Sequence, residues 1–179
     1  ACLKGLYLRI SELSERPQWS PVMSHFWQDN DGFWFLRIMG KGNKLRDVTL
    51  SDDFVEYLKR YRLYRGLPAL PRVDESEPLV HKIRGQGGMT VRQIRRLVQQ
   101  SFDLAQQSLL DDGFKDDAEQ LEAATAHWLR HTGATHDAQT RPPKHLSEDL
   151  GHSKIATTDQ IYIQTNIKER AKSGVKRKI

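Results

Sequence analysis

The sequence predicts one mostly helical α+β domain with a small antiparallel sheet at one edge. Three observations support this fold class. The chain has 179 residues, 37% of them hydrophobic, which is enough to bury a core without disulfides. Apolar residues recur at helical spacing in the stretches 51–63, 90–109, 126–136 and 144–150. Residues 33–50 instead form two strand-like runs around a Gly-rich turn, as in a β-hairpin.

The first stretch is apolar but carries one charge of interest. A mixed apolar pattern over residues 3–13 predicts a helix or turn-rich segment that ends before Pro17. Arg9 lies inside this pattern, and Glu12 follows it by three positions. At that spacing the carboxylate can pair with the guanidinium and fix its direction.

The hairpin turn, residues 40–43, places Lys41 between two glycines. Glycine permits close backbone approach, so the Lys41 ammonium could swing into a neighbouring site. The alternative is an ordinary solvated turn lysine, which this short context favours when taken alone.

Two longer helices are expected to follow. Ser51 would cap a helix that runs through Leu63, and Thr90 would cap a second helix with a basic face. A basic Gly-rich loop, residues 81–88, leads into that second helix, and we favour contact with a DNA backbone over a merely solvated face. The candidates for this contact are Lys44, Lys82, Arg84, Arg92, Arg95 and Arg96.

An acidic stretch, residues 111–122, is almost free of large apolar side chains. We expect it to be a surface insertion that avoids nucleic acid, because phosphates would repel its carboxylates.

The stretch 126–136 gathers histidines and an arginine on one helix. His127, Arg130 and His131 are related by i, i+3 and i+4 and should share a helical face. That face can present two kinds of hydrogen-bond donor to one anion. A short helix up to Leu150 should then end at Gly151 as its C′ residue.

Composition limits the compartment and the partners. Lys and Arg number 28 against 23 Asp and Glu, a net charge of +5 that modestly favours polyanionic partners but also suits any soluble basic protein. Cys2 is the only cysteine, so no internal disulfide can form and a cytoplasmic location is expected. No membrane span or signal peptide is present in the sequence, and the start at Ala1 suggests a piece of a longer protein.

Several kinds of site are disfavoured. His127 and His131 have a spacing that suits zinc, but Trp128 stands where the zinc-protease motif needs Glu, and no cysteine pair exists. Serine-hydrolase, dinucleotide-binding and Walker motifs are also missing. Arginine, lysine, histidine and tyrosine are left, which suit phosphoryl transfer without metal ions.

Four motifs, taken in chain order, resemble those of the tyrosine recombinase, or phage integrase, family. They are Leu8-Arg9-Ile10-Ser11-Glu12-Leu13, Gly40-Lys41-Gly42-Asn43-Lys44, His127-Trp128-Leu129-Arg130-His131, and Leu150-Gly151-His152-Ser153 leading to Thr157-Thr158-Asp159-Gln160-Ile161-Tyr162. The resemblance implies the catalytic-domain fold of DNA breaking-rejoining enzymes over residues 1–179, with the family's N-terminal core-binding domain absent from this chain. Such a domain should bind DNA weakly and recombine it poorly alone.

The resemblance also implies a role for each motif residue. Arg9 and Arg130 would clamp the scissile phosphate, and Lys41 would protonate the leaving 5′-oxygen. Tyr162 would attack to form a 3′-phosphotyrosyl link, which a 5′-hydroxyl later resolves. Tyr162 follows His152 at one residue more than is usual in the family.

The histidines and Glu12 would support that reaction. His127 would accept a proton or a hydrogen bond, and His152 would hydrogen-bond the phosphate. Glu12 would orient the Arg9 segment. His131 would pack in the helix or against the site residues without contacting the phosphate.

No metal, ATP or small-molecule cofactor is implied. The expected partners are double-stranded DNA and further copies of the chain, as a tetramer on DNA, in a bacterial or phage-encoded protein associated with the nucleoid. Two alternatives stay open: a type IB topoisomerase-like nicking-closing enzyme, and a DNA-binding module without catalysis.

Overall fold

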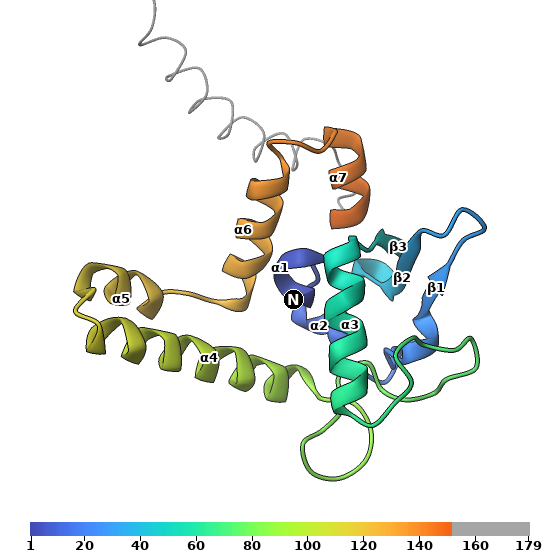
Figure 1. Ribbon diagram of the computed structural model, residues 1–179, viewed down its shortest axis with the longest axis horizontal. Coiled ribbons are helices and arrows are strands. Elements are labelled where there is room, and N and C mark those ends of the chain that lie inside the picture. Colours follow the sequence, from blue (N-terminus) through green and yellow to red (C-terminus); the bar gives the residue numbers. More distant parts are fainter. Residues whose placement is uncertain (152–179) are drawn as a thin grey trace, which may run out of the picture.

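The computed structural model describes residues 1–151, and His152, Tyr162 and the rest of the C-terminal stretch lie outside the described residues. The predicted fold class is confirmed, because the chain is mostly helical with one small antiparallel sheet (Figure 1). The elements are α1 (Cys2–Gly5), α2 (Ile10–Leu13), η1 (Met23–His25), β1 (Phe26–Gln28), β2 (Trp34–Met39), η2 (Lys41–Asn43), β3 (Leu45–Thr49), α3 (Asp52–Tyr64), α4 (Val91–Asp111), α5 (Lys115–Glu122), α6 (Ala126–Asp137) and α7 (Pro143–Leu150).

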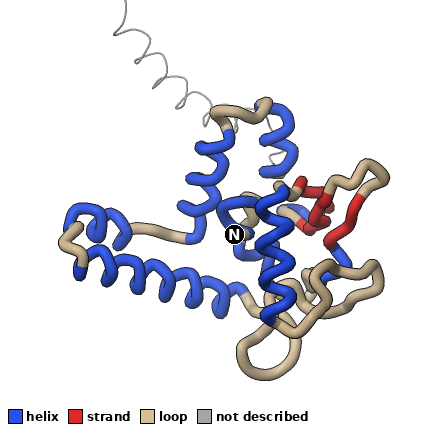
Figure 2. The backbone as a smooth tube through the Cα atoms, in the orientation of Figure 1, coloured by secondary structure: helices blue, strands red, loops and turns tan. Residues whose placement is uncertain are grey.

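The sheet lies at one edge of the molecule (Figure 2). Its order is β1-β2-β3, and both pairs are antiparallel. The predicted hairpin is therefore present as β2 and β3, with η2 as its turn, while β1 was not predicted. Leu36, Ile38 and Val48 are fully buried and turn one sheet face toward the core.

The predicted helix caps are present. The Ser51 hydroxyl accepts a hydrogen bond from the amide of Phe54 at the start of α3, and Thr90 does the same for Gln93 in α4. Leu58 of α3 belongs to the same buried cluster as the sheet residues, so α3 and the sheet share one core.

The N-terminal stretch forms two short helices, α1 and α2, and so matches the turn-rich alternative, with α2 ending before Pro17. Tyr7 between them has a φ of 51°, a left-handed conformation that is uncommon outside glycine. Leu6 and Leu8 on either side of it are fully buried. The break between the two helices is therefore buried in the core.

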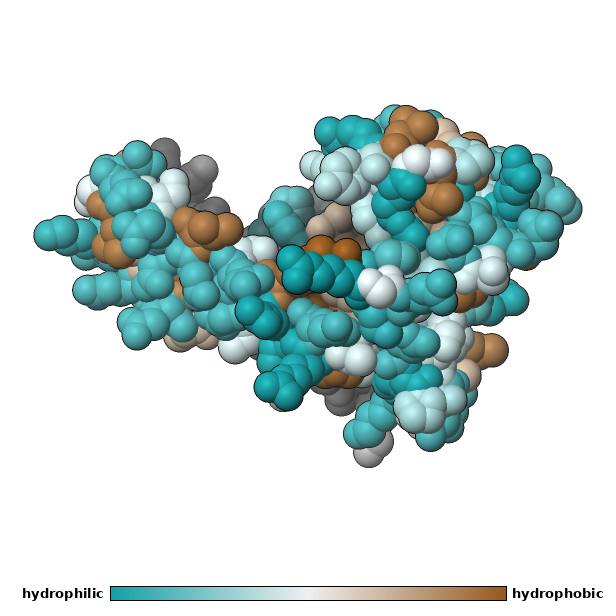
Figure 3. All heavy atoms as spheres, turned by 90° about the horizontal axis from the view of Figure 1, so that it is seen from below, coloured by the Kyte–Doolittle hydropathy of each residue, from teal (hydrophilic) through white to brown (hydrophobic). Residues whose placement is uncertain are grey.

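The acidic stretch 111–122 is on the surface, as expected, but much of it forms helix α5. This helix folds back on α4, and the Gln106 side chain donates a hydrogen bond to the carbonyl of Ala118 at 3.2 Å. Only Ile94 of α4 is fully buried, and α4 with α5 projects from the body as an arm (Figure 1). The arm surface is largely hydrophilic, with a few apolar patches (Figure 3).

Helix α6 lies unusually close to α1. A Cβ atom on Gly133 would sit 2.1 Å from the carbonyl oxygen of Lys4, so only glycine fits there. Gly151 ends α7 with a φ of 64°, which confirms the predicted C′ glycine. No helix within residues 1–151 is long and apolar enough to cross a membrane.

Candidate active site

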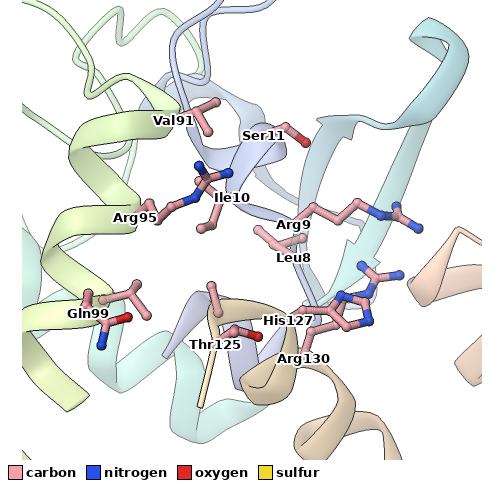
Figure 4. Close-up of a pocket in the computed structure, with 12 residues that line it drawn as sticks. Leu8, Arg9, Ile10, Ser11, Val91, Arg95, Gln99, Thr125, His127 and Arg130 are labelled. Atoms are coloured by element: carbon pink, nitrogen blue, oxygen red, sulfur yellow. The ribbon is translucent and has the colours of Figure 1, made fainter. Parts of the chain in front are cut away.

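A cavity of about 440 Å³ opens between α2, α4 and α6. Figure 4 shows Arg9, His127 and Arg130 at one end of it and Arg95 reaching in from α4. The polar and charged residues in its lining are Arg9, Ser11, Arg95, Gln99, Thr125, His127 and Arg130.

Arg9 is the residue immediately before α2. Its backbone amide donates to Glu12 Oε2 at 2.7 Å, and its Nη1 donates to Glu12 Oε1 at 3.2 Å. The side chain is 34% exposed, so the guanidinium is held from one side and open to a ligand on the other. The Arg9–Glu12 contact expected from the spacing is present.

Arg130 is held much more tightly than Arg9. Its Nη1 donates to the carbonyl of Tyr7, and its Nη2 donates to the carbonyl of Leu150 at 2.6 Å. The side chain is 5% exposed. Burial, together with the positive charges of Arg9 and Arg46, lowers its pKa to about 10, so Arg130 is still a cation at neutral pH. Tyr7, whose backbone is in the left-handed conformation, is thus the residue whose carbonyl accepts the hydrogen bond from Arg130.

Glu12 lies beneath the two arginines and is 2% exposed. Arg46 of β3 contacts both carboxylate oxygens, at 2.7 Å and 3.1 Å, and Arg130 Nη1 is 3.9 Å from Oε2. Burial alone would raise the pKa of Glu12, but the hydrogen bonds and charge of Arg46, with those of Arg9, hold it below its ordinary value. Glu12 is therefore ionised at neutral pH, and its single negative charge offsets part of the charge of Arg9, Arg46 and Arg130.

Two supporting residues were missed by the sequence analysis. Arg46 shares the core-facing side of β3 with Val48, as the strand period of two would place it. Trp19 donates its indole hydrogen to the carbonyl of Glu12 at 2.9 Å and stacks on His25 with ring centroids 4.6 Å apart. Of these two residues, only Arg46 had a signal in the sequence, namely a charged residue at an inward-facing strand position.

His127 stands in the first turn of α6 and is exposed toward the cavity. His131 does not line the cavity; its ring nitrogen Nδ1 lies 3.3 Å from the Thr135 hydroxyl on the exposed side of α6. The predicted histidine-arginine face is thus divided, and the structure brings only His127 and Arg130 to the cavity.

Lys41 lies in the exposed turn η2 and is not part of the cavity lining. The turn is closed by a hydrogen bond of 2.8 Å from the Gly40 amide to the Lys44 carbonyl. Gly42 has a φ of 71°, a conformation that glycine adopts without strain.

Of the residues expected to contact DNA, Arg95 alone lines the cavity. Lys82 lies 4.0 Å from Glu15 and is partly neutralised by it. The other candidates, Lys44, Arg84, Arg92 and Arg96, are exposed on the surface.

The arrangement suits a phosphodiester. Three guanidinium groups, those of Arg9, Arg95 and Arg130, and the imidazole of His127 line one open cavity, and the carboxylate of Glu12 lies behind Arg9 and Arg130 rather than in the cavity. Planar guanidinium groups bind phosphate oxygens in pairs. In the described part of the chain, no group of three or more His, Cys, Asp or Glu side chains could hold a metal ion.

Known proteins are similar to this chain in sequence and in fold. Residues 8–169 match the model of the phage integrase family. The tyrosine recombinase XerD of Staphylococcus epidermidis is 33% identical over 129 residues, which are 72% of this chain and 38% of that protein. The chain therefore spans well under half the length of this relative.

Two solved structures are similar in fold. The crystal structure of XerA recombinase superposes with a TM-score of 0.62 at 23% identity, covering 99% of this chain and 55% of that one. The pre-cleavage complex of the XerH site-specific recombinase bound to its difH substrate superposes with a TM-score of 0.53 at 25% identity, covering 86% of this chain and 40% of that one.

Proposed function

The chain belongs to the phage integrase family, and from this premise we propose that residues 1–179 act as the catalytic domain of a tyrosine site-specific recombinase. The substrate is double-stranded DNA, and the reaction cuts and rejoins its strands. The observation that carries the proposal is the cavity lined together by Arg9, His127 and Arg130.

The two arginines supply the charge for this reaction. Arg9 and Arg130 bind the non-bridging oxygens of the scissile phosphate and stabilise the negative charge of the transition state. The Tyr162 oxygen attacks phosphorus, the bond to the 5′-oxygen breaks, and a 3′-phosphotyrosyl ester forms. Lys41 delivers a proton to the departing 5′-oxygen once DNA brings the η2 turn to the site.

The histidines act on the same phosphate. His127 accepts a proton or a hydrogen bond at the cavity, and His152 donates a hydrogen bond to a phosphate oxygen. A 5′-hydroxyl then attacks the phosphotyrosyl ester, which restores the DNA backbone and frees Tyr162. One phosphoester replaces another at each step, so the reaction consumes no ATP and uses no metal ion.

The partners follow from this chemistry. The duplex lies along the cavity, where Arg95 contacts its backbone, with the exposed basic residues of α4 and of the preceding loop nearby. Four copies of the chain assemble on two duplexes in the bacterial cytoplasm, at the nucleoid.

A covalent trapping experiment tests the proposal. The protein is incubated with a library of duplexes of random sequence, each carrying one nick, so that cleavage near the nick releases a short fragment and prevents rejoining. We expect a denaturant-stable protein–DNA adduct with the wild type and none with Tyr162→Phe. No adduct with either protein would leave only a DNA-binding module.

The captured duplex then separates the two enzymatic possibilities. A recombinase joins two copies of the captured site, whereas a nicking-closing enzyme relaxes a supercoiled plasmid that carries one copy. Relaxation without joining would replace recombination as the function.

A further inference from the structure

Arg46 makes two side-chain hydrogen bonds to Glu12. Its Nη1 and Nη2 donate to the two carboxylate oxygens at 2.7 Å and 3.1 Å, a paired geometry that Arg9 and Arg130 do not have. The Arg46 side chain is 13% exposed. The guanidinium of Arg46 and the backbone amide of Arg9 therefore fix the Glu12 carboxylate together.

The same guanidinium reaches the end of α7. Its Nε donates to the carbonyl of Asp149 at 3.0 Å. A Cβ atom on Gly151 would meet the guanidinium carbon at 2.9 Å, and a Cβ on Gly40 would meet Nη1 at 2.7 Å. Arg46 is thus enclosed between the glycine that precedes Lys41 and the glycine that precedes His152.

We propose that Arg46 is a positioning residue for the recombination reaction. It holds the Glu12 carboxylate in the position from which this carboxylate orients the guanidinium groups of Arg9 and Arg130. It also fixes the backbone at the end of α7, where the chain enters the His152 motif. Arg46 does not line the cavity, so it acts through these neighbours and not on the DNA. The inference rests on the proposed function.

The planar fork of arginine is what the position requires. A lysine would keep the charge but could not bind both Glu12 oxygens and the Asp149 carbonyl from one rigid group. Displacement of a phosphate-binding group by about 1 Å can slow a reaction ~10²-fold. Arg46→Lys should therefore slow chemistry while it leaves DNA binding intact.

The chain offers a matched control for this substitution. Arg37 of the neighbouring strand β2 also makes two hydrogen bonds to one carboxylate, from Nε and Nη2 to Asp47 at 2.9 Å and 3.0 Å, but on the exposed face of the sheet. Arg37→Lys disrupts a pair that does not involve Glu12, so it reports the cost of losing one arginine–carboxylate pair of the sheet.

The experiment measures the rate of adduct formation at saturating concentrations of the nicked duplex captured with the wild type. We expect Arg46→Lys to lower the rate constant ~10²-fold, with unchanged DNA affinity and unchanged final adduct yield, and Arg37→Lys to match the wild type. Equal rates for the two variants, or a loss of yield without a loss of rate, would overturn the proposal. Lack of adduct with the wild type would instead overturn the proposed function.

Two further measurements sharpen the test. A 5′-bridging phosphorothiolate leaves without a proton, so it bypasses Lys41; the Arg46→Lys defect should persist on it, and its disappearance would contradict the route through Glu12. Glu12→Asp keeps every charge but withdraws the carboxylate from Arg46. This variant should show the same defect, without addition to that of Arg46→Lys, and it decides the question if the Arg46 variant does not fold.

Discussion

Arg130 on α6 donates a hydrogen bond of 2.6 Å from Nη2 to the carbonyl of Leu150, the last residue of α7. Its other terminal nitrogen donates to the carbonyl of Tyr7, before α2. One buried guanidinium therefore joins three segments of the fold that are far apart in sequence. Arg9, in contrast, donates hydrogen bonds only to Glu12 among residues 1–151.

Substitutions of Arg130 and Arg9 should both slow catalysis but should differ in their effect on stability. Arg130→Ala leaves the buried carbonyls of Tyr7 and Leu150 without their donor and removes a positive charge near Glu12, so it should lower the free energy of unfolding by about 3–5 kcal/mol. Arg9→Ala removes a partly exposed pair and should cost less than about 1 kcal/mol. Both variants should form adduct at least ~10²-fold more slowly. Urea unfolding and single-turnover trapping check this, and equal destabilisation would contradict it.

Glu12 should make stability depend on pH. Its pKa is lower in the folded protein than in the unfolded chain, so the stability that it contributes is complete above its ordinary pKa of 4.5 and is lost as pH falls through the folded-state value. We expect the free energy of unfolding to decrease between about pH 5 and pH 3. Glu75 and Asp137 also have lowered pKa values and contribute to the same decrease.

A comparison of two variants isolates the contribution of Glu12 to this loss of stability in acid. Glu12→Gln should lower stability at neutral pH and reduce the slope of unfolding free energy against pH in the acid range. Glu56→Gln, at an exposed carboxylate, should leave that slope unchanged. Identical slopes for the wild type and Glu12→Gln would show that Glu12 is not the titrating group.

Gly133 should not tolerate a side chain. Its added Cβ would lie 2.1 Å from the Lys4 carbonyl oxygen, which is backbone and cannot rotate away. Gly133→Ala should therefore force α1 and α6 apart and lower stability by about 1–3 kcal/mol. Thr132→Ala, on the exposed side of the same helix, should change stability by less than about 0.5 kcal/mol. Thermal unfolding of the two variants distinguishes these outcomes.

Arg95 should contribute one phosphate contact. Arg95→Gln should weaken binding to the captured duplex and reduce the slope of log affinity against log salt by about one. Arg60→Gln is the control, because Arg60 lies on α3 with its guanidinium 4.6 Å from the Tyr57 ring. An unchanged slope with Arg95→Gln would place the DNA away from this end of the cavity.

Metal chelation should have no effect. Saturating EDTA should leave the rate of adduct formation unchanged, because guanidinium groups carry the charge that a metal ion carries in other phosphoryl-transfer enzymes. Loss of the adduct with EDTA and its return with magnesium would contradict the proposed chemistry.

Local signals in the sequence were sufficient for most of the fold. Ser51 and Thr90 begin α3 and α4 as expected, and Gly151 ends α7. These features depend on residues close in sequence, through side-chain caps and backbone conformation. Short local motifs also identified Arg9 and the pair His127 and Arg130. The structure brings all three residues to one cavity.

Other features depend on residues far apart in sequence. Arg46 meets Glu12 and Asp149 only after the sheet packs on α2 and α7, and Trp19 meets the Glu12 carbonyl through a loop with no regular pattern. The break at Tyr7 is equally nonlocal, since its carbonyl is the partner of Arg130 on α6. The two partners of each contact lie too far apart in sequence for a periodic pattern in a short window to predict them.

The arm of α4 and α5 also offers a point of attachment for optical measurements. Its outer end is exposed at Phe114 and Lys115, and Cys2 is the only native cysteine. A dye on Lys115→Cys, in a Cys2→Ser background, would sit about 30 Å along the 21-residue helix from Val91 at the cavity. Energy transfer to a dye at the end of the duplex would then report the direction in which DNA crosses the enzyme.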